Sequence, residues 1–277
     1  MKLAASLLVL AATLPPALAT LEDKAPEFPL REKYPELPTI STADFLALEN
    51  PVVIDARNAA EYNVIHVDGA LNQLVGDMEK KFLDGVRKDH PDAPIVFYCN
   101  GVTCSKSYKA GEKARVWGFD NFFVYDSGIF TFAESAPERT LFFGEALDAK
   151  TVNEKLISKD ELEKSCKAPA DFIELMRSGD WRIYDVRDKT ERQEAPIKVG
   201  KMAKVTMDEF VSFLDKGAVP KSKILIFDNV GKQVRWLQYY LEEAGVTDYV
   251  FLDGGVGAWL DAGYDEHGEK TVRGAAE

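Results

Sequence analysis

The chain has 277 residues, of which 46% are hydrophobic and 29% are charged, and this length and composition favour two folded domains over one. Its formal net charge of -12 at pH 7 excludes a polyanion such as nucleic acid as the expected partner, because phosphate groups would be repelled.

The first nineteen residues have the layout of an export signal. A positively charged start precedes an apolar run, and the segment closes on the small-residue sequence ALA before position 20. The apolar run is too short to span a membrane, so no membrane span is expected. We therefore expect a signal peptide over residues 1–19 and an exported protein, periplasmic if the source is bacterial. Residues 20–36, rich in charge and proline, are expected to form an N-terminal arm.

Two long segments of the chain repeat one pattern of apolar runs and glycines. Gly118 corresponds to Gly245, and Gly128 corresponds to Gly255, both at a separation of 127 residues. Such a spacing predicts tandem domains of about a hundred residues each. We expect domains over 37–135 and 155–268, a linker over 136–154 and a C-terminal tail over 269–277.

Within each repeat, short apolar runs alternate with helical segments. In the first repeat, VVID (52–55), IVFY (95–98) and FFVY (122–125) are predicted to be buried strands. In the second repeat, ILIF, WLQYYLEEAG and YVFLD continue the same alternation. Strands separated by helices predict the α/β class, with a parallel sheet flanked by helices in each domain.

Cys99 follows directly after the IVFY strand, at the edge where open parallel sheets bind ligands. The loop that continues to Cys104 leads into a helix expected to begin near Ser105. Free N–H groups and the dipole at such a helix start stabilise a thiolate. We therefore expect Cys99 to ionise readily and to act as a nucleophile without a neighbouring histidine.

Several motifs, taken in order, resemble the rhodanese-like sulfurtransferases. They are Asp55-Ala56-Arg57, Glu61-Tyr62, HVDGALN at 66–72, the Cys99 loop, Gly118 and the Ser127-Gly128 turn. The resemblance implies two tandem rhodanese-like domains in which Cys99 is the catalytic residue that carries a persulfide. The implied donor is thiosulfate, polysulfide or a protein persulfide, and the implied acceptor is a thiol or cyanide. No cofactor is implied, and the histidines and cysteines show no metal-ligand spacing.

The substrate-binding candidates of this loop share backbone N–H groups that can face an anion, and they are Asn100, Gly101, Val102, Thr103, Cys104 and Ser105. Arg57 is a further candidate for substrate contact, although Asp55 and Arg57 are expected chiefly to form a buried ion pair.

Cys104 stands where many single-domain members of the resembled family carry arginine. It is either a small residue that fills the loop or a resolving thiol that closes a disulfide with Cys99. The second possibility favours a thiol-disulfide redox protein, and a non-enzymatic sulfur carrier or partner-binding module is a third hypothesis. Cys166, in a charged helical segment, is expected to be structural.

The second repeat has Asp228 at the position that corresponds to Cys99. A carboxylate cannot carry a persulfide, so we predict that this repeat is degenerate and non-catalytic. An alternative is that Asp228, Lys232 and Arg235 bind a ligand at the start of their own helix.

Overall fold

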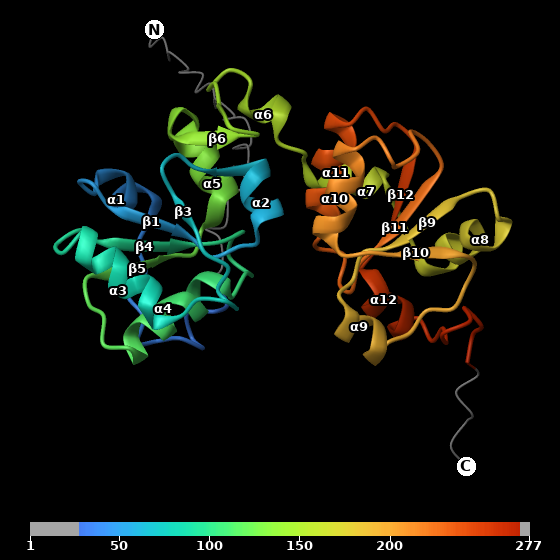
Figure 1. The fold of residues 1–277 in the computed structure, drawn as a ribbon, viewed down its shortest axis with the longest axis horizontal. Coiled ribbons are helices and arrows are strands. Elements are labelled where there is room, and N and C mark those ends of the chain that lie inside the picture. Colours follow the sequence, from blue (N-terminus) through green and yellow to red (C-terminus); the bar gives the residue numbers. More distant parts are fainter. Residues whose placement is uncertain (1–27, 272–277) are drawn as a thin grey trace, which may run out of the picture.

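The computed structural model describes residues 28–271, and these form two α/β units that lie side by side (Figure 1). The predicted signal peptide, the first part of the predicted arm and the last six residues lie outside this range. Over residues 28–271, no helix combines the length and the apolar character needed to cross a membrane.

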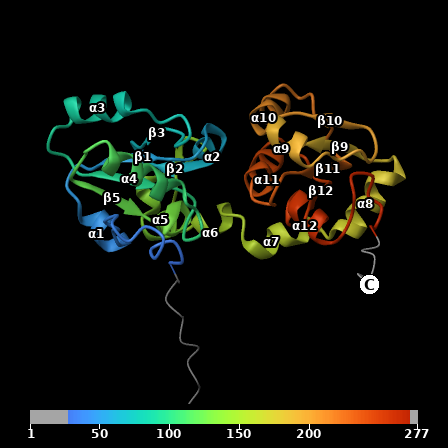
Figure 2. The ribbon, with the colours of Figure 1, turned by 90° about the horizontal axis from the view of Figure 1, so that it is seen from below.

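The first repeat is built on a parallel sheet, as predicted, and its strands follow the order β3-β1-β4-β5. Its strands are β1 (Val52–Asp55), β3 (Leu71–Asn72), β4 (Ile95–Tyr98) and β5 (Phe122–Tyr125). Its helices are α1 (Thr42–Ala47), α2 (Ala59–Val64), α3 (Lys80–Asp89), α4 (Lys106–Val116) and α5 (Gly128–Ser135). Figure 2 shows the two repeats from below. Helices α3 and α4 lie on one side of the sheet and α1, α2 and α5 on the other (Figure 1), and their buried residues form two separate clusters. Both faces of the central strands are therefore covered, which explains why their sequences are continuously apolar.

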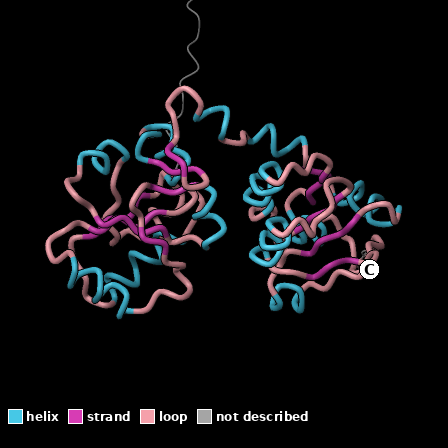
Figure 3. Tube along the Cα trace, turned by 45° about the horizontal axis from the view of Figure 1, so that its top comes forward, coloured by secondary structure: helices cyan, strands magenta, loops and turns pink. Residues whose placement is uncertain are grey.

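The segment 136–154, expected to link the repeats, is folded onto the first repeat. It contains a short 3-10 helix (Pro137–Arg139), β6 (Thr140–Phe142), β7 (Glu145–Ala146) and α6 (Val152–Lys155). Strand β6 pairs antiparallel with β2 (Ile65–Val67) and with β7, which forms a small second sheet. After this segment, a loop and a short helix lead the chain to the second repeat (Figure 3).

The second repeat also has the predicted parallel sheet, with its strands in the order β10-β9-β11-β12-β8. Its strands are β8 (Cys166–Lys167), β9 (Arg182–Asp185), β10 (Met202–Lys204), β11 (Ile224–Phe227) and β12 (Tyr249–Leu252). Its helices are α7 (Lys159–Lys164), α8 (Pro169–Ser178), α9 (Lys189–Glu194), α10 (Met207–Asp215), α11 (Val234–Glu243) and α12 (Gly255–Asp261).

The repeated glycines at the starts of α5 and α12 allow two backbones to approach closely. A Cβ added to Gly128 would lie 2.3 Å from the Cα of Gly101, and one added to Gly255 would lie 2.6 Å from the carbonyl carbon of Asn229. Both glycines have positive φ angles, of 82° and 62°. Each loop after the central strand therefore lies against the next helix start, which only glycine permits there.

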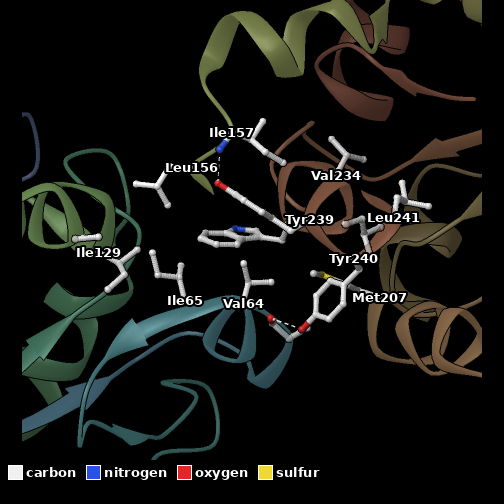
Figure 4. Close-up of a cluster of buried hydrophobic side chains, with 14 of the residues drawn as sticks. Val64, Ile65, Ile129, Leu156, Ile157, Met207, Val234, Tyr239, Tyr240 and Leu241 are labelled. Carbon is white, nitrogen blue, oxygen red and sulfur yellow. Dashed lines mark hydrogen bonds between the residues drawn. The ribbon is translucent and has the colours of Figure 1, made fainter. Parts of the chain in front are cut away.

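A single hydrophobic cluster continues from one repeat into the other. Helix α2 packs against α10 and α11, so that Val64 and Ile65 lie opposite residues of the second repeat (Figure 4). The Tyr240 hydroxyl donates a 2.7 Å hydrogen bond to the Ala60 carbonyl across this interface. The apolar packing sets the second repeat beside the Cys99 loop of the first.

Candidate active site between the two repeats

Cys99 ends β4 as predicted, but its side chain is buried. The residue is 0% exposed, its thiol donates to the Cys104 carbonyl oxygen at 3.2 Å, and its sulfur lies 3.3 Å from Ser107 Oγ. Burial raises the pKa of the Cys99 thiol well above its ordinary value, and the interaction with Cys104 raises it further. The expectation that Cys99 ionises readily is therefore wrong, while its catalytic role stays a prediction.

Cys104 is the half-buried thiol of the same loop. The neighbouring Cys99 side chain lowers the pKa of Cys104 to about 6, against the opposing effect of burial. Hydrogen bonds from the backbone N–H groups of Lys106 and Asn100 and the nearby Lys106 charge lower this pKa further. Backbone groups at the start of α4 thus stabilise a thiolate, as expected of this loop, but they do so at Cys104.

A network of polar side chains positions the loop that runs from Cys99 to Ser105. Glu61 accepts hydrogen bonds from Asn100 Nδ2 at 2.7 Å and from Lys106 Nζ at 2.6 Å. Arg57 donates to Asn100 Oδ1 at 3.3 Å and forms the predicted ion pair with Asp55 at 2.6 Å. Because Arg57 is 0% exposed, direct substrate contact is not available to it. We correct its role to that of a positioning residue.

Two neighbouring cavities open beside this loop, with volumes of about 490 Å³ and about 280 Å³. Asn100, Thr103 and Cys104 line both, whereas Gly101 and Val102 line only the larger and Ser105 only the smaller. Neither cavity is lined by Cys99 or Arg57. Among residues 28–271, no cluster of three or more His, Cys, Asp or Glu side chains could hold a metal ion.

The second repeat forms the opposite wall of the larger cavity, which the sequence did not predict. Lys232 and Arg235, suggested as ligands at their own helix, face the loop of the first repeat instead. Trp236 lines the same wall and stacks on Phe130 of α5, with ring centroids 5.3 Å apart. The sequence predicted a helical segment here from its place in the repeat, but nothing in the pattern identified what this helix would contact.

The corresponding loop of the second repeat is filled by its own carboxylate. Asp228 is buried and accepts hydrogen bonds from the backbone N–H groups of Gly231 at 2.5 Å and Gln233 at 2.6 Å. Burial raises the pKa of this carboxyl group, although these N–H groups act in the opposite direction. The N–H groups that face an anion in such a loop are thus already occupied, which supports the prediction of a degenerate second site.

Among curated proteins, the chain is 29% identical over 131 residues to a tRNA uridine(34) hydroxylase of Buchnera aphidicola, covering 44% of this chain and 40% of that protein. It is 33% identical over 103 residues to a tRNA uridine(34) hydroxylase of Salmonella heidelberg, covering 34% of this chain and 27% of that protein. The chain thus matches less than half the length of these relatives.

Two solved structures are similar at low sequence identity. A thiosulfate sulfurtransferase from Pseudomonas aeruginosa is 20% identical with a TM-score of 0.40, covering 85% of this chain and 44% of that one. A polysulfide-sulfur transferase from Wolinella succinogenes is 19% identical with a TM-score of 0.32, covering 43% of this chain and 91% of that one.

The family model described as a rhodanese-like domain matches residues 42–135 and 168–262, one match in each repeat. These two segments make up more than half of the chain and contain the first parallel sheet and all strands of the second except β8. The chain therefore belongs to the rhodanese-like domain family, with two such domains in tandem.

Proposed function

We propose that this protein is a sulfurtransferase that carries sulfane sulfur as a cysteine persulfide on the loop from Cys99 to Ser105. The observation that supports this most is the placement of Cys104. Cys104 lines both cavities whereas Cys99 has no exposed surface, so a substrate in either cavity can reach Cys104, whose pKa is lowered in this loop. The thiolate is the form of cysteine that attacks sulfur.

In the proposed reaction, the Cys104 thiolate attacks the outer sulfur of a donor such as thiosulfate. A sulfur–sulfur bond to Cys104 forms while the donor's own sulfur–sulfur bond breaks, and sulfite leaves with the bonding electron pair. A thiolate or cyanide acceptor then attacks the terminal sulfur and releases Cys104 as a thiolate. The N–H groups of Asn100 and Lys106 stabilise the anion in both states.

The sequence alone suggested Cys99 as the persulfide carrier, and the proposal gives the first attack to Cys104 instead. Cys99 has no exposed surface, so a donor in either cavity meets Cys104 first. Cys99 keeps a supporting role, because its neighbouring side chain lowers the pKa of Cys104.

A thiol-disulfide redox protein is the second candidate. The interaction between the two thiols favours it, because a sulfenate or persulfide on Cys104 would have Cys99 as a neighbouring resolving thiol. In that case an oxidant would link Cys99 to Cys104, and a reductant would restore both thiols.

Thiocyanate formation from thiosulfate and cyanide tests the proposal. Cys104→Ser is expected to lower turnover at least about a hundredfold, because serine is a far weaker nucleophile at this pH. Cys166→Ser is the matched control, since Cys166 lies in β8 of the second repeat, its pKa is raised to about 11 by burial, and it lines neither cavity. Full turnover in Cys104→Ser would overturn the assignment. Reversible disulfide formation without thiocyanate would favour the redox candidate.

Export is also proposed, on the sequence of residues 1–19 alone. N-terminal sequencing of the protein from its source is expected to begin at Thr20. The tRNA activity named for the curated relatives is not proposed for this chain, because it matches less than half of their length and its net charge of -12 opposes a polyanion.

A further inference from the structure

The larger cavity is positively charged although the protein as a whole is acidic. Lys232 and Arg235 line it, and its lining contains no aspartate or glutamate. In the part of the chain that the structure describes, neither cation has a carboxylate within ion-pair distance. Two unpaired cations beside a half-closed cavity concentrate anions there, even in a chain of net charge -12.

The Arg235 side chain is fixed by contacts with neighbouring residues, but one of its N–H donors has no hydrogen-bond partner. Its Nη2 donates to the Ile157 carbonyl at 3.2 Å, and its guanidinium carbon lies 4.1 Å from the centre of the Phe130 ring. Its Nε is buried without a hydrogen-bond partner. Burial also lowers the pKa of Arg235, as expected where no anion compensates the charge. An anion in the cavity would supply that compensation.

The same cavity is larger and more apolar than a small inorganic ion needs. Its volume of about 490 Å³ lies in the range of sites that enclose organic ligands, about 300 to 1,000 Å³. Phe130, Leu162 and Trp236 provide an apolar wall next to the cations. A bare thiosulfate would leave this wall in contact with water.

We infer that the second repeat, although it lacks a cysteine, provides the substrate-binding wall of the active site. We further infer that the substrate is an organic sulfur compound with an anionic group bound by Arg235 and Lys232 and an apolar group against Phe130 and Trp236. The inference rests on the proposed function, since it names the substrate class of that site.

Two thiosulfonates make the chemistry testable. Benzenethiosulfonate and methanethiosulfonate have the same reactive group and charge and differ only in the ring. In each case the Cys104 thiolate bonds to the terminal sulfur, the bond between that sulfur and the sulfonyl group breaks, and a sulfinate leaves with the electron pair. No oxidant or reductant is consumed.

The full chain is expected to transfer sulfur from benzenethiosulfonate with a kcat/KM at least about tenfold higher than from methanethiosulfonate, because the ring is buried against the apolar wall. Phe130→Leu is expected to reduce this preference about fivefold. Arg235→Gln is expected to raise KM for both donors about tenfold with little change in kcat, because the charged hydrogen bonds are lost and Cys104 is not touched.

A binding experiment separates the inference from the proposed function. Benzenesulfonate has the ring and the anionic group but no sulfur to transfer, and calorimetry should find it bound about tenfold more weakly by Arg235→Gln than by the unmodified chain. Arg182→Gln is the control. Arg182 is an exposed residue at the start of β9, and it lines neither cavity.

Equal binding by the unmodified chain and Arg235→Gln, or equal kcat/KM for the two donors, would overturn the inference. Binding as expected with no sulfur transfer from either donor would support the anion-binding wall and overturn the proposed function.

Discussion

Burial distinguishes the two cysteines of the active-site loop. Cys99 is enclosed beneath the loop, whereas a tight turn, in which Cys104 N donates to the Gly101 carbonyl at 2.8 Å, brings Cys104 over it. A negative charge on Cys99 would have no contact with water, whereas a charge on Cys104 would be partly hydrated. Of the two thiolates, that of Cys104 is therefore favoured. The sequence places both cysteines between a strand and a helix, and it does not specify which sulfur the turn leaves facing solvent.

The pH dependence of alkylation tests this difference. Iodoacetamide reacts with the thiolate, so modification of Cys104 should increase with pH and reach half its maximal rate near pH 6. Cys99→Ala removes the neighbouring side chain that lowers the pKa of Cys104, and this pKa should then rise by about one unit. Cys166→Ala should leave the midpoint unchanged. A midpoint near 9 in the unmodified chain would contradict the account.

At the scale of elements, the loop depends on the close approach of α5. Gly128 and Gly118 have nearly equal φ angles of 82° and 81°, but only Gly128 lies against another backbone. Gly118→Ala should lower the free energy of unfolding by about 1 to 2 kcal/mol, from backbone strain alone. Gly128→Ala adds a clash with Gly101, so it should destabilise the protein more and reduce sulfur transfer by at least about tenfold. Urea denaturation and the thiocyanate assay measure both effects, and similar values for the two variants would refute the role of this contact.

The loop that begins at Asp228 in the second repeat is expected to stabilise the fold. Asp228→Ala leaves two partly buried backbone N–H groups without an acceptor, so it should lower the free energy of unfolding by about 2 kcal/mol. Asp188→Ala removes an exposed helix cap and should cost about 1 kcal/mol. Urea denaturation compares the two, and sulfur transfer should continue in the part of the Asp228→Ala protein that remains folded. An Asp228→Ala protein as stable as Asp188→Ala would contradict this expectation.

At the scale of the whole molecule, the fold of each repeat could be predicted from the sequence. The cavity that residues of both repeats line could not. Apolar strands such as IVFY and the paired glycines Gly128 and Gly255 determine local structure that is the same in each repeat. The positions of Arg235 and Trp236 depend on which helix of one repeat packs against the other. That is set by contacts between residues far apart in the chain, and the periodicity of a helix indicates a buried face without indicating its partner.

The continuous core predicts that the two repeats unfold together. Tyr240→Phe removes the hydrogen bond to the Ala60 carbonyl across the interface, so the free energy of unfolding should fall by about 1 kcal/mol. Calorimetry should find a single transition in both the unmodified chain and this variant, with the variant melting at lower temperature. Two separate transitions in the unmodified chain would contradict a shared core.

The position of the transferred sulfur tests the central claim most directly. After brief incubation with thiosulfate, fragment ions from the peptide 89–106, which contains both Cys99 and Cys104, locate the added sulfur by mass spectrometry. The account predicts one additional sulfur atom on Cys104. Additional sulfur on Cys99 from the outset, with Cys104 unmodified, would contradict it.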